Sequence, residues 1–106
     1  MLFIATLQHS PEDCFARPEN AEAFKQALGI WDNLEATAKS LDMTLIGSYI
    51  NPNEHLFYFI MDADNYYKVT QLLGSVMLTH HTAKITPVHT LRQAVDSVKK
   101  QLSQEK

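Results

Sequence analysis

Cysteine is almost absent from this sequence, which carries a single copy, Cys14, in 106 residues. One thiol excludes an internal disulfide framework, and such usage is typical of proteins kept in a reducing compartment. We therefore expect a cytoplasmic protein. The opening run MLFIATLQHS lacks a basic region and a small-residue cleavage site, so it predicts a first strand rather than a signal peptide.

Long hydrophobic runs and an excess of positive charge are missing as well. No apolar stretch approaches the roughly 18 residues of a membrane helix. The chain has 9 Lys and Arg against 12 Asp and Glu, a net charge of −3, so we expect neither a membrane nor nucleic acid as a partner. Glycine-rich phosphate loops and the GxSxG, CxxC and HExxH motifs are also absent.

The apolar residues that are present predict an α+β fold in one domain. Leu56 to Met61 are all large and apolar or aromatic, which indicates a central strand with both faces covered. Further strands are predicted at 2–7, 44–50 and 82–89, with 55–63 as the full central strand. Apolar residues at helical spacing predict one helix of about twenty residues after Asn20, a second from Asp64 or Asn65, and a third from Thr90.

Boundary residues refine this prediction. The long loop SPEDCFARPEN separates the first strand from Asn20, a plausible helix N-cap. Gly74 is placed to end the second helix, which leaves residues 75–81 irregular. Pro87 cannot donate a hydrogen bond within a sheet and predicts an edge strand. Thr90 and Gln93 form a capping box, and residues 103–106 are expected to fray.

The order β-α-β-β-α-β is that of the ferredoxin-like motif. It predicts an antiparallel four-stranded sheet in the order 4-1-3-2, with helices on one face and residues 91–106 as an added C-terminal helix and tail on the 1–90 core. The other face would be bare and apolar, which predicts a homodimer or higher homo-oligomer joined through it.

This topology and the strand composition resemble the dimeric α/β-barrel superfamily. That group includes cofactor-free monooxygenases and haem-degrading enzymes. The resemblance extends over almost the whole chain and implies a dimer with a cavity between two sheets. It does not by itself imply a reaction.

Residues able to bind a metal or take part in catalysis are predicted to lie at one end of the sheet. If the first and third strands run parallel, four segments meet at this end of the sheet. They are His9, the loop that contains Cys14, the Asp62–Asp64 segment and residues 77–81, which lead into the last strand. Imidazole and thiolate are the usual ligands of zinc, copper and nickel. We therefore predict a transition-metal site formed by His9, Cys14, His80 and His81, with Asp62 or Glu12 as weaker ligands.

A purely structural interpretation accounts for the same residues. In it His9 is a hydrogen-bonded strand end, Cys14 a small buried apolar residue and the His80–His81 pair a solvated loop. His55 and His89 are predicted to lie at the opposite end of the sheet, exposed or capping.

Three functions remain open on this basis. The first is a small homodimer that binds a transition metal. The second is a cofactor-free or haem-related monooxygenase-like enzyme acting on a small organic ligand, with His9, Tyr49 or Tyr58 as polar groups in the cavity. The third is a structural or interaction module without a site.

Overall fold

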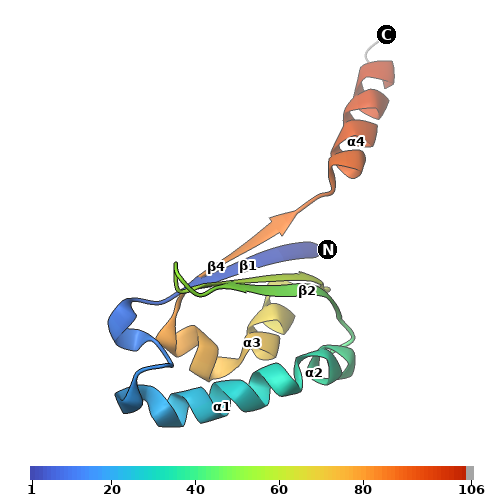
Figure 1. Ribbon diagram of the computed structural model, residues 1–106. Helices are drawn as coiled ribbons and strands as arrows, with labels where there is room; N and C mark the ends of the chain where they lie inside the picture. The colour runs from blue at the N-terminus through green and yellow to red at the C-terminus, as the bar shows by residue number, and fades with distance from the viewer. Residues whose placement is uncertain (105–106) are drawn as a thin grey trace.

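A four-stranded antiparallel sheet forms the centre of the computed structural model, which describes residues 1–104 (Figure 1). Its strands are β1 (Leu2–Gln8), β2 (Thr44–Asn51), β3 (Leu56–Asp62) and β4 (Thr82–Val88). They lie in the order β2-β3-β1-β4, which is 4-1-3-2 when read from the other edge. The inner strands are β1 and β3, which explains their nearly continuous apolar sequences. The architecture is α+β and is compatible with a ferredoxin-like fold.

Several local predictions are confirmed at the strand and helix ends. β2 and β3 form a hairpin, and β4, which contains Pro87, is an edge strand. The Asn65 side chain accepts a hydrogen bond of 3.1 Å from the backbone N–H of Lys68 and caps the helix that follows. Thr90 and Gln93 exchange side-chain and backbone hydrogen bonds of 2.9 and 3.0 Å, as a capping box requires.

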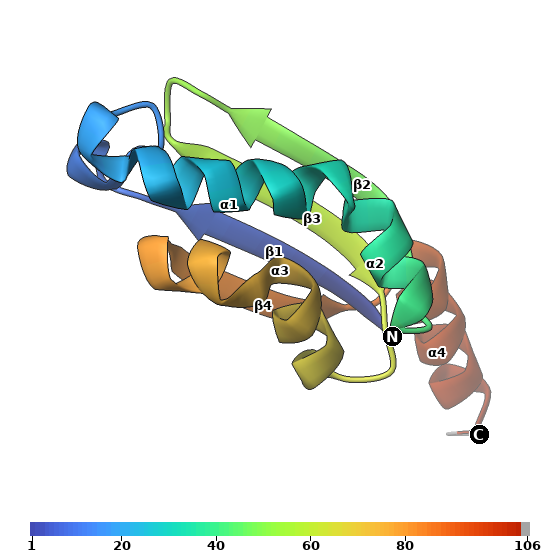
Figure 2. The same ribbon diagram turned by 90° about the horizontal axis from the view of Figure 1, so that it is seen from below.

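One face of the sheet is covered by α1 (Ala21–Asp32), α2 (Leu34–Ser40) and α3 (Tyr66–His80), as Figure 2 shows. Alternate residues of the inner strands point into this layer, because side chains on a strand alternate between faces. The resulting core consists mainly of Phe3, Ala5, Leu7, Phe57, Phe59, Met61, Val69, Leu72, Leu73 and Met77. This core fixes the ends of β1 and β3, where the histidines lie.

The single long helix expected after Asn20 is instead two helices, so that prediction is wrong in one detail. The backbone leaves the helical region at Asn33, whose side-chain amide donates a 2.9 Å hydrogen bond to the carbonyl of Gly29. A side chain that takes over a backbone carbonyl in this way competes with helix continuation. The apolar stripe nevertheless continues through α2, where Leu34 and Ala38 are buried.

The helix expected to stop at Gly74 continues to His80, which corrects the prediction of an irregular segment at 75–81. Gly74 has φ +80°, so the helix is interrupted at that residue and then resumes. The combination of this φ with ψ 161° is readily adopted by glycine alone. The kink turns the last part of α3 toward the sheet and buries Met77, whose backbone carbonyl holds His81.

Replacing Gly74 with alanine should destabilise the protein by about 1–3 kcal/mol, because a Cβ is strained at positive φ. That Cβ would also approach Ile30 Cδ1 to 3.4 Å. Gly29→Ala is the matched control, since Gly29 lies exposed in α1 with open space around it. The control should stabilise the protein by about 0.5–1 kcal/mol. Urea unfolding of both variants measures this, and equal effects would contradict the strain at Gly74.

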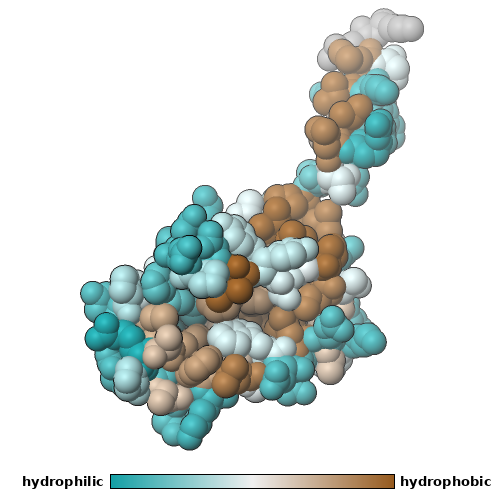
Figure 3. All heavy atoms as spheres, in the orientation of Figure 1, coloured by the Kyte–Doolittle hydropathy of each residue, from teal (hydrophilic) through white to brown (hydrophobic). Residues whose placement is uncertain are grey.

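The other face of the sheet has no helix over it. Residues of β1 and β3 alternate between buried side chains, which face the helices, and partly exposed ones, which lie on this bare face. The partly exposed residues include Ile4, Tyr58 and Ile60. The helix α4 (Leu91–Gln104) does not cover this face and projects away from the body (Figure 1). Leu91 and Val98 on α4 are 80% and 53% exposed. Figure 3 shows hydrophobic surface on the sheet near the base of α4 and along one side of that helix.

Two further findings concern the chain as a whole. The predicted frayed tail is helical at Ser103 and Gln104, and residues 105–106 lie outside the described residues. Within residues 1–104, the helices are too short or too polar to cross a membrane.

Candidate metal centre

Three histidines meet where β1 ends. β1 is antiparallel to both of its neighbours, so Gln8 pairs with Leu56 of β3 and with Thr82 of β4. The residue after Gln8 therefore lies beside the residues that precede those two strands. These residues are His9, His55 and His81. A backbone hydrogen bond of 3.2 Å from His9 N–H to the His55 carbonyl continues the strand pairing.

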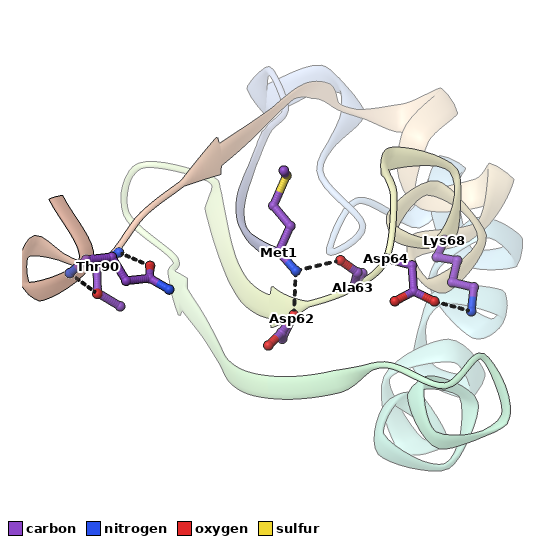
Figure 4. A network of polar contacts seen from close by, with 7 residues as sticks. Met1, Asp62, Ala63, Asp64, Lys68 and Thr90 are labelled. Atoms are coloured by element: carbon purple, nitrogen blue, oxygen red, sulfur yellow. Dashed lines mark hydrogen bonds and ion pairs between the residues drawn. The ribbon is translucent and has the colours of Figure 1, made fainter. Parts of the chain in front are cut away.

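This arrangement corrects the predicted direction of β3. The first and third strands are antiparallel, not parallel, so the end of β3 lies at the other end of the sheet from His9. Asp62 instead accepts a 2.8 Å hydrogen bond from the amino group of Met1 at the start of β1 (Figure 4). Its neighbour Asp64 is paired with Lys68 at 3.4 Å. Asp62 is therefore not a ligand candidate, and His55 joins the cluster from which it was excluded.

The histidines form a hydrogen-bonded chain. His81 Nδ1 lies 2.7 Å from the backbone carbonyl oxygen of Met77, and His81 Nε2 lies 2.9 Å from His9 Nδ1. His9 Nε2 in turn lies 3.1 Å from His55 Nδ1. His9 and His81 are buried, with 9% and 8% of their surface exposed. The chain thus runs from a fixed backbone carbonyl out to the partly exposed His55.

The order of these bonds determines the tautomer of His9. A carbonyl can only accept, so His81 Nδ1 carries the proton that is donated to Met77. In a neutral His81 the other nitrogen is an acceptor, and His9 Nδ1 must donate to it. Neutral His9 is then left with a lone pair on Nε2, on the side that faces His55. This is the tautomer that metal binding through Nε2 needs.

Burial keeps the two inner imidazoles neutral. It is the main reason that the pKa of His9 lies below its ordinary value, and the nearby His81 and His55 rings lower that pKa further. The Asp13 carboxylate acts in the opposite direction on His9. Burial also lowers the pKa of His81, although its bond to the Met77 carbonyl partly offsets the effect. At neutral pH both rings offer lone pairs rather than charges.

Cys14 reaches the cluster through the long loop after β1. This loop is not irregular throughout, since it contains short 3₁₀ helices at Pro11–Asp13 and Pro18–Asn20. Asn20 occupies the predicted N-cap position of α1, but its side chain makes no capping hydrogen bond there. Its amide instead donates to the carbonyls of Glu12 and Cys14, at 3.0 and 2.9 Å, and holds the loop closed. Phe15 is buried and anchors the loop in the core.

The residues able to hold a metal ion together are His9, Cys14 and His55. Within the described part of the chain, one ligand atom from each lies within 4.8 Å of the others. Ligand atoms around a tetrahedral zinc are about 3.3–3.8 Å apart, given bond lengths of 2.0–2.3 Å. The His9–His55 separation of 3.1 Å is close to this range.

The remaining predicted ligands take other places. His81 lies in the cluster but uses its nitrogens on Met77 and His9, so it supports His9 rather than facing an ion. His80 ends α3, with its ring 5.5 Å from that of Phe15, and lies outside the metal-holding group. Glu12 is exposed, and only its backbone carbonyl takes part in the loop contact to Asn20.

Neither tyrosine named as a cavity group borders the cavity beside the cluster, although Tyr49 borders a second cavity near Leu34. Tyr58 pairs with Thr6 on the side of the sheet away from the helices, and Tyr49 is 61% exposed with its ring over Gly47. Between sheet and helices the cluster instead adjoins an apolar cavity of about 300 Å³. His9, Cys14 and His55 form part of its wall, so an ion held there would face the cavity.

Acidification should destabilise the metal-free protein. The folded-state pKa values of His9 and His81 are lowered, so below the unfolded value of 6.5 the unfolded chain binds more protons. Their contribution to stability is complete above pH 6.5 and is lost as the pH falls below it. Thermal melting in chelator from pH 7.5 to 5 measures the effect. His81→Gln should reduce the slope and His89→Gln should not; a melting temperature that rises toward pH 5 would contradict the expectation.

Comparison with known proteins does not place this chain in a family. No protein-family model matches the sequence, and no curated protein matches it either. The function therefore has to be inferred from the geometry of the His/Cys cluster.

Proposed function

We propose that this protein binds one transition-metal ion per chain through His9 Nε2, His55 Nδ1 and Cys14 Sγ. The observation that carries the proposal is that one ligand atom from each of these three residues lies within 4.8 Å of the others. They come from three separate segments, which the strand pairings and the closed loop bring together. In a reducing compartment such as the cytoplasm, Cys14 stays available as a thiolate ligand.

The supporting contacts around His9 favour a ligand role over a structural one. Metal-binding histidines generally donate their second ring N–H to a fixed acceptor, which sets the ring orientation and the tautomer. Here His81 is that acceptor, and it is itself fixed by the Met77 carbonyl.

The donor set narrows the choice of metal. Two imidazoles and a thiolate suit zinc, copper or nickel, whereas calcium and magnesium require oxygen ligands. A divalent ion with one thiolate and two neutral imidazoles carries a net charge of +1. Three protein ligands leave one tetrahedral position open, and catalytic zinc sites have this arrangement. The site is therefore suited to bind a further ligand as well as to hold the ion.

The direct test is metal analysis of the protein purified without a histidine tag, followed by Co²⁺ titration of chelator-treated protein. We expect one equivalent of metal per chain and a Co²⁺ spectrum with a thiolate charge-transfer band. Blocking Cys14 with iodoacetamide should remove that band. Failure to take up Zn²⁺, Cu²⁺, Ni²⁺ or Co²⁺ would refute the proposal.

The proposed assembly is a homodimer of ferredoxin-like subunits joined through the bare face of the sheet. Ile4 and Ile60 are paired across β1 and β3, and Tyr58 lies two residues from Ile60 on the same face. An apolar surface of this kind on a soluble chain is typical of an interface. The metal cluster lies at the end of the inner strand β1, and its three proposed ligands come from a single chain.

A further inference from the structure

The wall of the cavity beside the His/Cys cluster is largely aromatic. Phe15, Phe24, Trp31 and Phe57 contribute to its wall. Their rings form a connected group, with centroid separations of 5.3 Å between Trp31 and Phe57 and 6.0 Å between Phe15 and Trp31. A volume of about 300 Å³ is enough for a single aromatic ring with small substituents. The cavity therefore combines aromatic walls with a cluster of metal ligands.

Trp31 has an unused donor. Its indole Nε1 is buried and has no hydrogen-bond partner among the described residues. Leaving a buried N–H unpaired costs about 1–3 kcal/mol, so such a group in a native structure calls for an explanation. Trp31 borders the cavity beside the metal ligands as well as a second one on the Leu34 side. The Nε1 atom exposes less than 1 Å² of surface, so an acceptor in the cavity reaches it once the Trp31 ring turns toward the bound molecule.

We propose that the cavity binds a small aromatic acid or phenol, whose anionic oxygen takes the open position on the metal and whose ring lies against Phe15, Trp31 and Phe57. A second oxygen on the ring accepts the N–H of Trp31. This inference rests on the proposed metal site and adds its ligand class. A single anionic oxygen matches the net charge of +1 on the loaded site.

Charge makes the binding depend on the metal. Without an ion, the described residues of the cavity wall include neither lysine nor arginine to attract an anion. An anion gains nothing from such a site. The ion supplies a positive charge, and the coupling is reciprocal, so an aromatic acid must also tighten metal binding.

The test compares Co²⁺-loaded with chelator-treated protein, using 4-hydroxybenzoate, benzoate and acetate as probes. Trp31 is the only tryptophan, so its fluorescence reports on the cavity, while the Co²⁺ absorption bands report on the metal. We expect 4-hydroxybenzoate to change both signals and to bind the loaded protein about tenfold or more tightly than the metal-free protein. Acetate lacks the ring that contacts the aromatic wall, so it should bind the loaded protein about tenfold or more weakly than benzoate.

Trp31→Phe keeps an aromatic wall and removes the N–H. Read from the Co²⁺ bands, this variant should bind 4-hydroxybenzoate about fivefold more weakly while its affinity for benzoate changes little. Co²⁺ bands that no aromatic acid alters, or equal affinity for loaded and metal-free protein, would overturn the inference and leave the metal site intact. Absence of Co²⁺ uptake before any acid is added would refute the metal site itself, and the inference with it.

Discussion

Replacing His9 with alanine should abolish stoichiometric metal binding, whereas replacing His80 with alanine should leave it unchanged. In the proposed site His9 provides a ligand nitrogen, and its loss leaves only Cys14 and His55 to hold an ion. His80 is adjacent in sequence to His81 but stands outside the metal-holding group. We expect the affinity of His9→Ala for Zn²⁺ to fall by more than about 100-fold, beyond the usual effect of losing a supporting contact.

His81→Gln should give an intermediate result, because His81 acts through His9. Its loss leaves the ligands in place but removes the acceptor that sets the His9 tautomer. Loss of such a supporting contact typically lowers metal affinity by about 10–100-fold. Competition with a chromophoric chelator measures all three variants. Equal affinities for His9→Ala and His80→Ala would contradict the assignment of His9 as a ligand.

A second ligand variant separates metal binding from folding, since His9 is buried and its loss also disturbs the core. His55 is partly exposed in the turn before β3 and has φ +54°. Asparagine tolerates this left-handed backbone better than most residues. His55→Asn should therefore keep the melting temperature of the metal-free protein close to that of wild type while metal affinity falls. Retained affinity would remove His55 from the site.

The sequence was sufficient to predict the strands, because each has a distinctive local pattern. The apolar run in β3, Pro87 in β4 and the Thr90–Gln93 capping box all lie where the local pattern predicts. The positions at which the helices break depend on single residues. Nothing in the local pattern indicated that Asn33 would bond the Gly29 carbonyl, or that the chain would re-enter a helix after Gly74.

Part of the site was predictable, and the rest depended on strand direction. His9 and Cys14 were singled out from their residue types and the long loop between β1 and α1, and they belong to the cluster. His55 was missed because β3 was assigned the direction of β1. The signal was present, since neighbouring β1 and β3 are antiparallel in the 4-1-3-2 order and the residue before β3 must then lie beside the residue after β1.

Placing a charge on the bare face of the sheet should convert the protein to a monomer. Ile60 lies on this face opposite Ile4, with Tyr58 close by. Ile60→Asp would bury an unpaired carboxylate at the centre of a dimer interface, and such a group costs several kcal/mol. We expect the dimer dissociation constant to rise by more than about 100-fold, which light scattering after size-exclusion chromatography measures at micromolar concentration.

The matched control is the same change on the opposite side of the molecule. Leu28 on α1 is 43% exposed, so Leu28→Asp alters surface hydrophobicity without touching the bare face. This variant should remain a dimer. A monomeric wild type would refute the proposed assembly, and dissociation of Leu28→Asp alone would move the interface to the helical side. Retained metal binding in monomeric Ile60→Asp would show that the cluster works within one chain, as its ligands all come from a single protomer.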